Sequence, residues 1–300
     1  MWFKNLILYR FNPAALELTP DQLQAQLEPK RFAPCGSTQT FSYGWTAPLG
    51  TQPDRLVYNS NGYWLIRSRR EDKILPASVV HEFADERALE LEEQSGRKLN
   101  RKELKQLREE ITQELLPKAF TRSSYCSAYF DLKQGWLVVD SASSKKAEEL
   151  TTHLRTCLGS LPIKPPKVKQ PLATEWRTWV LQGTPATMEL GDECVLSDQN
   201  DQGGVIRCKG QALDSDEIRG HLEAGKQFTR VALTWDKRLS FVLGDDLSLK
   251  RLQFEDVVAD QADEADTLEQ QFDTDFSLMT LELSRLLPAL MDVFGGESAL

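Results

Sequence analysis

Short clusters of lysine and arginine are the residues in this sequence whose type and spacing point most directly to chemistry. Such side chains bind DNA by displacing the counterions condensed on its phosphates. Several clusters adjoin expected strand ends or helix starts, where main-chain N–H groups can assist. A single cluster is more often a solvated face, so that interpretation stays open for each. The candidate DNA-binding residues are Lys73, Lys118, Arg122, Lys145, Lys146, Arg207 and Lys209.

Sequence motifs of enzymes are largely missing. Gly225-Lys226-Gln227 lacks the upstream glycine and the hydroxyl residue of a phosphate-binding loop, and neither GxSxG nor HExxH occurs. Asp245-Asp246 with Lys250 could hold Mg²⁺ in a nuclease, although a hairpin turn with solvated carboxylates is the stronger interpretation. No helix-turn-helix, zinc finger or basic zipper is evident. We therefore expect no catalytic residue, metal or cofactor, and we expect contacts to the DNA backbone and not to base edges.

The acidic residues are concentrated at the C-terminal end of the chain. The 300 residues carry a net charge of -9, but residues 255–300 alone carry -11, which leaves +2 on residues 1–254. The overall charge therefore neither supports nor excludes DNA binding. Five scattered cysteines without a CxxC motif suggest reduced thiols in a cytoplasm. No apolar run is long enough to span a membrane.

Hydrophobic periodicity predicts an α+β chain with antiparallel sheets. Residues 2–9 are expected to form a strand, and Thr19-Pro20 to start a helix. Asn61-Gly62 predicts a tight hairpin turn within residues 55–67. Further strands are expected at 125–132 and 136–139, and a helix at 144–158 that Ser141 or Ser143 starts. Residues 76–118, which lie between expected strands, are predicted to form a pair of charged helices joined at Ser95-Gly96.

The best candidate for a linker is a proline-rich stretch, with four prolines in residues 161–171. It divides the chain into four parts: a central α+β domain (1–75 plus 119–163), a helical tip insertion (76–118), a linker (164–171) and a C-terminal α+β base domain (172–300). In the last part we expect helices at 174–182 and 215–224. We expect strands at 189–196, 204–208, 229–235, 240–243 and 249–254. An acidic helix or helix pair is expected at 263–294.

Nine short segments, which together extend over essentially the whole chain, carry a resemblance to a known family. They are 2–6, 32–37, 71–76, 115–120, 143–148, 158–162, 203–207, 249–252 and 272–276. In order and at matching spacing, they resemble the RdgC family of bacterial recombination-associated proteins. The resemblance implies a protein that binds duplex DNA, and also single-stranded DNA in some cases, without sequence preference. It also implies a ring-shaped homodimer with a positive central hole that hinders RecA-mediated strand exchange.

The resemblance places Phe120 at the dimer interface, although a core phenylalanine is an equally good interpretation. A cytoplasmic, nucleoid-associated protein without a catalytic residue is expected. Two alternatives remain open. The acidic C-terminal helices could contact RecA directly as a protein-interaction module, or the chain could be a Mg²⁺-dependent nuclease.

Overall fold

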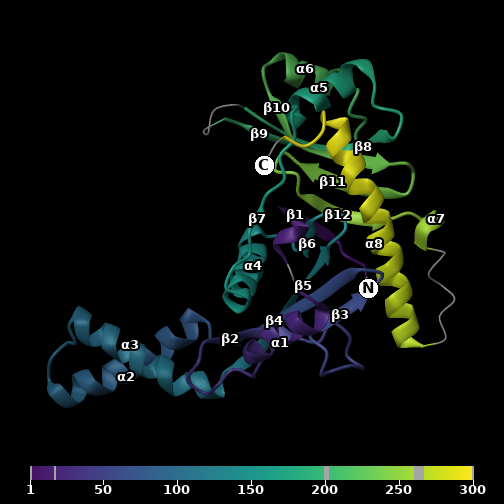
Figure 1. The fold of residues 1–300 in the computed structure, drawn as a ribbon. Coiled ribbons are helices and arrows are strands. Elements are labelled where there is room, and N and C mark those ends of the chain that lie inside the picture. Colours follow the sequence, from purple (N-terminus) through teal and green to yellow (C-terminus); the bar gives the residue numbers. More distant parts are fainter. Residues whose placement is uncertain (1, 17, 199–202, 260–266, 299–300) are drawn as a thin grey trace. The chain divides into compact units, whose positions relative to one another are not determined.

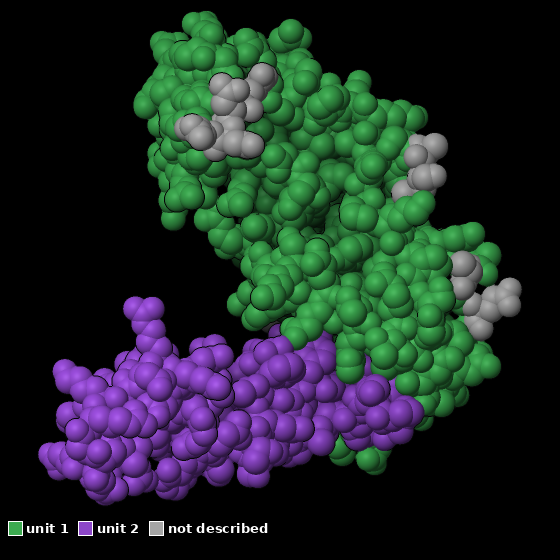
Figure 2. All heavy atoms as spheres, turned by 90° about the vertical axis from the view of Figure 1, so that its left-hand side faces the viewer, with its two compact units in different colours: residues 1–26, 47–66, 126–300 green, residues 27–46, 67–125 purple. Residues whose placement is uncertain are grey.

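The computed structural model describes residues 2–16, 18–198, 203–259 and 267–298, which fall into two units. Unit 1 comprises residues 1–26, 47–66 and 126–300, and unit 2 comprises residues 27–46 and 67–125 (Figure 2). Strands β4 (Tyr63–Ile74) and β5 (Phe120–Asp131) contribute residues to both units. The chain therefore leaves unit 1 twice and returns to it twice.

An antiparallel β-sheet is the framework of unit 1 (Figure 1). Its strands follow one another in the order β5-β6-β1-β12-β11-β10-β8-β9, and β7 pairs with β1 while β3 pairs with β4. The bounds are β1 (Asn5–Phe11), β3 (Val57–Ser60), β6 (Trp136–Asp140), β7 (Ile163–Lys164), β8 (Met188–Ser197), β9 (Val205–Lys209), β10 (Gln227–Trp235), β11 (Leu239–Gly244) and β12 (Leu249–Phe254). The N-terminal strand β1 lies in the middle of the sheet, so it joins the first and last thirds of the chain.

Three helices cover one face of this sheet: α5 (Leu172–Gln182), α6 (Asp216–Glu223) and α8 (Leu268–Val293). Strand residues such as Leu6 and Val231 point into the same buried cluster as Trp176 and Phe276 of the helices. Successive strand residues alternate between faces, so the neighbours of these buried residues point to the other side. Unit 1 also contains α4 (Ser144–Leu158), α7 (Asp256–Ala259) and all but the last residue of α1 (Pro20–Leu27).

Unit 2 is built from β2 (Phe41–Thr46), parts of β4 and β5, and the helices α2 (Ala77–Ser95) and α3 (Arg101–Leu115). The two helices bury a small apolar cluster that includes Ala84, Leu107 and Ile111. Gly96 ends α2 in the left-handed conformation, with φ of 67°. Asn100 then starts α3 with a capping box, in which its side chain accepts from the N–H of Glu103.

Most of the predicted elements are confirmed, including the helix pair and the Asn61-Gly62 hairpin. The first strand was placed too early, because it begins at Asn5 and continues to Phe11. Strand β2 was not predicted. The proline-rich stretch includes the short strand β7, which pairs with β1. The last helix begins at Leu268, and residues 263–266 of its predicted range lie outside the described residues. The predicted division into four domains stays a prediction.

The absence of a side chain at Gly44 is required by the path of β2 in unit 2. A Cβ atom there would lie 2.6 Å from Phe32 Cα and 2.8 Å from the Lys30 carbonyl oxygen. We expect Gly44→Ala to lower the free energy of unfolding by about 2 kcal/mol, because main chain and not a flexible side chain must move. Urea unfolding followed by tryptophan fluorescence measures this. Gly220→Ala is the control, since a Cβ there meets nothing within 4 Å. Equal stability of the two variants would contradict the prediction.

Candidate nucleic-acid interface

Two predicted site residues, Arg207 and Lys209, lie on β9 in unit 1 and flank the buried Cys208. Because Cys208 belongs to the helix-covered core, its two neighbours point to the opposite face of the sheet. Both side chains are exposed. Strand β10, on the other side of β8 from β9, adds Arg230. This residue is also exposed and lies between the buried residues Phe228 and Val231. We call Arg207, Lys209 and Arg230 the basic face.

The register of the sheet brings the two arginines of the basic face close together. Val195 of β8 pairs with Arg207 on one side and with Arg230 on the other. Two strand spacings separate these arginines, so their Cα atoms lie about 10 Å apart. None of the three cations forms an ion pair within the described part of the chain. Glu193, which is opposite Lys209, is bound by Arg251 at 2.6 Å. Arg230 lies close enough to Asp245 for its charge to act on the pKa of that carboxyl, so the face presents positive charge that is only partly balanced.

Lys145 and Lys146 lie in the first turn of α4, also in unit 1. Both are exposed, and among the described residues neither forms an ion pair. Ser143 occupies the N-cap position, as predicted, but its side chain accepts no hydrogen bond from the helix. The free N–H groups and the helix dipole add to the two lysine charges at this end. The helix start thus favours an anion.

The remaining predicted residues belong to unit 2. Lys73 in β4 donates a hydrogen bond of 3.4 Å to the Ala119 carbonyl oxygen. Lys118 ends the short 3-10 helix Leu116–Lys118, and Arg122 follows in β5. Both of these cations are exposed. Phe120 lies between them with 84% of its surface exposed, so the interpretation as a core phenylalanine is wrong for the single chain.

The densest basic cluster of the sequence is Arg67-Ser68-Arg69-Arg70. Its arginines mostly form contacts within unit 2. Arg69 lies 4.3 Å from the ring centre of Phe32 and donates to Glu71 at 3.0 Å. The pKa of Glu71 is lowered, first by the N–H of Cys35, which donates to it at 2.8 Å, and also by Arg69. Arg70 pairs with Asp72 at 2.8 Å. These arginines hold strands and loops together, so their charge is already partly balanced.

A further basic residue, Arg97, is paired at the corner between α2 and α3. Its guanidinium donates to Glu103 at 2.6 and 3.0 Å. These bonds, followed by one from the N–H of Asn100, lower the pKa of Glu103 to about 2. Because the folded pKa is depressed, the contribution of this carboxylate to stability is present above its unfolded pKa and is lost as the pH falls towards 2.

We expect the Arg97→Ala substitution to raise the pKa of Glu103 towards its ordinary value, because the larger of its two causes is removed. NMR titration of the Glu103 side-chain carboxyl carbon measures the pKa directly. Arg87→Ala is the matched control, since Arg87 pairs with Glu90 on an exposed helix surface of the same unit. The interpretation fails if the Glu103 pKa is the same in the native protein and in Arg97→Ala.

The two aspartates that could suggest a nuclease lie in the turn between β11 and β12. Asp246 closes this turn, since its Oδ1 accepts from the N–H of Ser248 at 3.0 Å and from its hydroxyl at 2.5 Å. Burial raises the pKa of Asp245, and the neighbouring Asp246 raises it further. Within the described ranges, no group of three or more His, Cys, Asp or Glu residues could hold a metal ion.

None of the helices described is both long and apolar enough to cross a membrane.

Comparison with known proteins gives one consistent result. Residues 1–297 match the family model described as "Putative exonuclease, RdgC". A "Recombination-associated protein RdgC" of Aeromonas hydrophila is 43% identical over 300 residues, which cover 99% of each chain. The protein of the same name from Pseudomonas aeruginosa is 45% identical over 301 residues, covering 99% of this chain and 98% of the relative. The relative from Tolumonas auensis is 41% identical over the full length of both chains.

Proposed function

The chain belongs to the RdgC family, and from this premise we propose that it acts in recombination by binding DNA without sequence preference. The observation that carries the proposal is the basic face, with three exposed cations that have no ion-pair partner among the described residues. Cations on a β-sheet surface can bind phosphates along the DNA backbone, which carries no base identity. The lysines at the start of α4 and the cations of unit 2 extend the set of candidate contacts.

Assembly as a ring-shaped homodimer is part of the same proposal. Unit 2 exposes large apolar side chains, namely Phe41, Ile74, Phe83, Leu89, Leu91, Phe120 and Tyr125. Exposed large apolar side chains mark protein–protein interfaces where they form one patch. A second copy of the chain is the partner we propose, with Phe120 in the interface. Light scattering at micromolar concentration should give the mass of a dimer, whereas a monomer would contradict the proposed assembly.

Binding itself is tested with duplexes of random sequence. In a fluorescence anisotropy titration, log K should fall linearly with log salt, by about 0.9 for each phosphate neutralised. Duplexes rich in A·T and in G·C pairs should bind alike within about threefold, since contacts to phosphates carry no sequence information. A strong preference for one sequence would contradict backbone binding.

We further propose that the protein limits RecA-mediated strand exchange mainly by occupying DNA, in the cytoplasm and on the nucleoid. Changing Lys118, Arg122, Lys145 and Lys146 together to glutamate should lower DNA affinity far more than any single change, because phosphate contacts act through summed charge. Inhibition of strand exchange should fall in parallel. A folded variant that no longer binds DNA but inhibits as before would instead indicate direct contact with RecA.

Part of the acidity that the alternative assigns to contact with RecA is used inside the fold. Asp273 accepts hydrogen bonds from Tyr58 at 2.5 Å and from Ser60 at 2.8 Å. Asp275 and Glu282 are buried, with 8% and 1% of their surface exposed. Several of the carboxylates on α8 therefore hold the fold together. Glu269, Asp273 and Asp292 remain exposed on α8.

A nuclease activity, which the description of the family model suggests, is tested separately. The purified protein is incubated with supercoiled plasmid and Mg²⁺ or Mn²⁺, and with linear duplex to detect exonuclease action. We propose that neither substrate is cleaved. Cleavage that Asp245→Asn/Asp246→Asn abolishes would overturn this part of the proposal and assign the turn between β11 and β12 as the catalytic site.

A further inference from the structure

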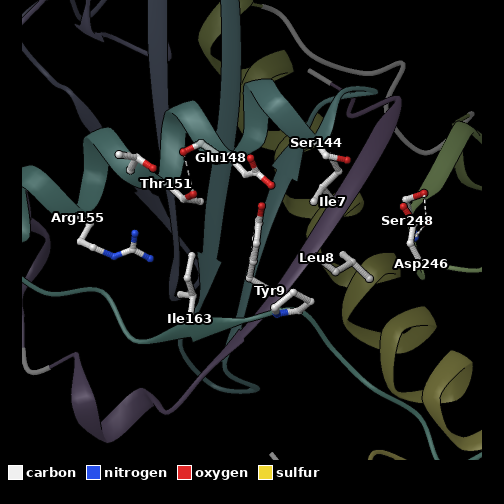
Figure 3. Close-up of a pocket in the computed structure, with 12 residues that line it drawn as sticks. Ile7, Leu8, Tyr9, Ser144, Glu148, Thr151, Arg155, Ile163, Asp246 and Ser248 are labelled. Atoms are coloured by element: carbon white, nitrogen blue, oxygen red, sulfur yellow. Dashed lines mark hydrogen bonds between the residues drawn. The ribbon is translucent and has the colours of Figure 1, made fainter.

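Strand β1 has a gap along one of its edges in unit 1. On one side, β6 pairs with all of Leu6 to Arg10. On the other side, β12 pairs as far as Leu6, and β7 pairs only from Arg10 onward. The intervening residues Ile7, Leu8 and Tyr9 therefore have no strand beside them on this edge. They line a cavity of about 450 Å³, which is in the size range of ligand pockets (Figure 3).

The main chain of Leu8 points into this gap. Neighbouring residues of a strand direct their N–H and C=O groups to opposite edges, and the hydrogen bonds of β1 fix which residues face which edge. The Asn5 carbonyl accepts from the N–H of Ser141, and the N–H of Phe11 donates to the Gly135 carbonyl. The main-chain N–H and C=O groups of the odd-numbered residues of β1 therefore point to β6 and to the turn before it. Leu8 faces the other edge, where no described residue bonds to its N–H or C=O. Leu8 is 3% exposed, so these two groups are unpaired in a largely buried place.

Helix α4 forms the wall above the gap, and after the lysine-bearing first turn it places one acidic and one basic side chain on the cavity. Glu148 and Arg155 both line the cavity, and within the described chain neither forms an ion pair. Their Cα atoms are seven residues apart, which corresponds to about 10.5 Å along the helix. Figure 3 shows Ser144 at the Ile7 end of the cavity and Arg155 at the Ile163 end. The helix therefore runs in the same direction as β1.

Two hydroxyl side chains that line the cavity lie between these two charges along α4. Thr151 and Thr152 of α4 line it together with Tyr9, whose ring extends from β1 towards Glu148 (Figure 3). Burial raises the pKa of Tyr9, the charge of Glu148 raises it further, and the hydrogen bond to Thr151 opposes both. The hydroxyl of Tyr9 thus stays protonated and can donate. Ile163 and Pro165 provide an apolar wall.

We propose that this cavity binds a short peptide of about three residues with free termini, which adds a strand to the open edge of β1. Three extended residues span about 10 Å, which matches the separation of Glu148 and Arg155. Strands β12 and β7 bound the gap at both ends, so a longer extended segment does not fit. The ammonium group lies at Glu148 and the carboxylate at Arg155. The peptide therefore runs parallel to β1.

Parallel pairing fixes the two main-chain hydrogen bonds. The N–H of Leu8 donates to the carbonyl of the first peptide residue, and the carbonyl of Leu8 accepts from the N–H of the third. The N–H of the second residue points away from β1 and is not used. The side chain of that residue lies on the same side of the sheet as Leu8, against the core, so a small residue is required there. This peptide site does not depend on the proposed DNA binding.

Trialanine is the probe, and calorimetric titration of the full-length protein measures its affinity. N-acetyl and C-amide forms remove one charge each, and each should bind at least about tenfold more weakly. Methylation of the amide nitrogen of the third peptide residue should abolish binding, because it removes the N–H that donates to the Leu8 carbonyl. Methylation of the second nitrogen should change the affinity by less than about threefold. Failure of trialanine to bind at millimolar concentration, or equal binding of both methylated forms, overturns the proposal.

Two variants locate the site on this cavity. Arg155→Ala should weaken trialanine but not its C-amide form, and Glu148→Gln should weaken trialanine but not its N-acetyl form. Both side chains are exposed, so the unfolding midpoint of each variant should stay at the native value. Duplex DNA affinity is measured alongside and should change little in Glu148→Gln. If each variant weakens charged and capped peptides to the same extent, the assignment of the two charges is wrong.

Discussion

Changing Arg207, Lys209 and Arg230 together to glutamate is expected to weaken duplex DNA binding by about a hundredfold near physiological salt. The change removes three attractive charges from the basic face and adds three repulsive ones. Because each phosphate contact also releases counterions, the slope of log K against log salt should become less steep by about 2 to 3. Anisotropy titrations at four salt concentrations give affinity and slope together.

The control must carry the same change of charge elsewhere on unit 1. Arg219 meets this need, since it is exposed on α6, which covers the other face of the sheet. Arg219→Glu is compared with the single variant Arg230→Glu, so that total charge is matched. We expect about a fivefold loss from Arg230→Glu and less than a twofold loss from Arg219→Glu. Equal losses would show that only total charge matters, and the basic face would then not be the contact surface.

Elements with a local signal were predictable from the sequence. The Asn61-Gly62 step predicts its hairpin because both residues readily adopt positive φ, and they do so at 53° and 85°. The helix pair of unit 2 is set by a repeating apolar stripe and by the Ser95-Gly96 break. Strand β2 has no such signal. Its Gly44 weakens strand propensity, and the reason for the glycine is the close approach of Phe32, which is distant in the sequence.

The candidate site was only partly predictable, because a cluster in the sequence is not a cluster in space. Arg67, Arg69 and Arg70 form the densest basic run, yet their partners Tyr125, Phe32 and Asp72 engage them in unit 2. Arg230 is isolated in the sequence and was missed. Alternation with the buried Val231 and Leu233 was a usable signal for its orientation. Its pairing with Arg207 across Val195 depends on strand register, which the sequence does not reveal.

The ion pair between Arg238 and Glu282 shows how an acidic residue of α8 serves the fold of unit 1. Glu282 has 2% of its side chain exposed, and Arg238 donates to both of its oxygens, at 2.8 and 2.6 Å. Arg285 reaches the same carboxylate at 3.4 Å from a more exposed position. The bidentate pair connects the turn after β10 with the middle of α8. It therefore fixes the helix on the sheet.

Arg238→Ala is expected to lower the free energy of unfolding by about 3 kcal/mol, because it leaves the charge of Glu282 buried with only the weaker partner Arg285. Urea unfolding measures this loss, and circular dichroism at low urea confirms that the variant folds. The neighbouring Lys237→Ala is the control. Lys237 is 82% exposed and lies 3.9 Å from Glu189, so its loss should cost less than about 0.5 kcal/mol. If Arg238→Ala costs no more than Lys237→Ala, the buried pair does not hold α8 on the sheet, and the apolar residues of α8 alone account for its position.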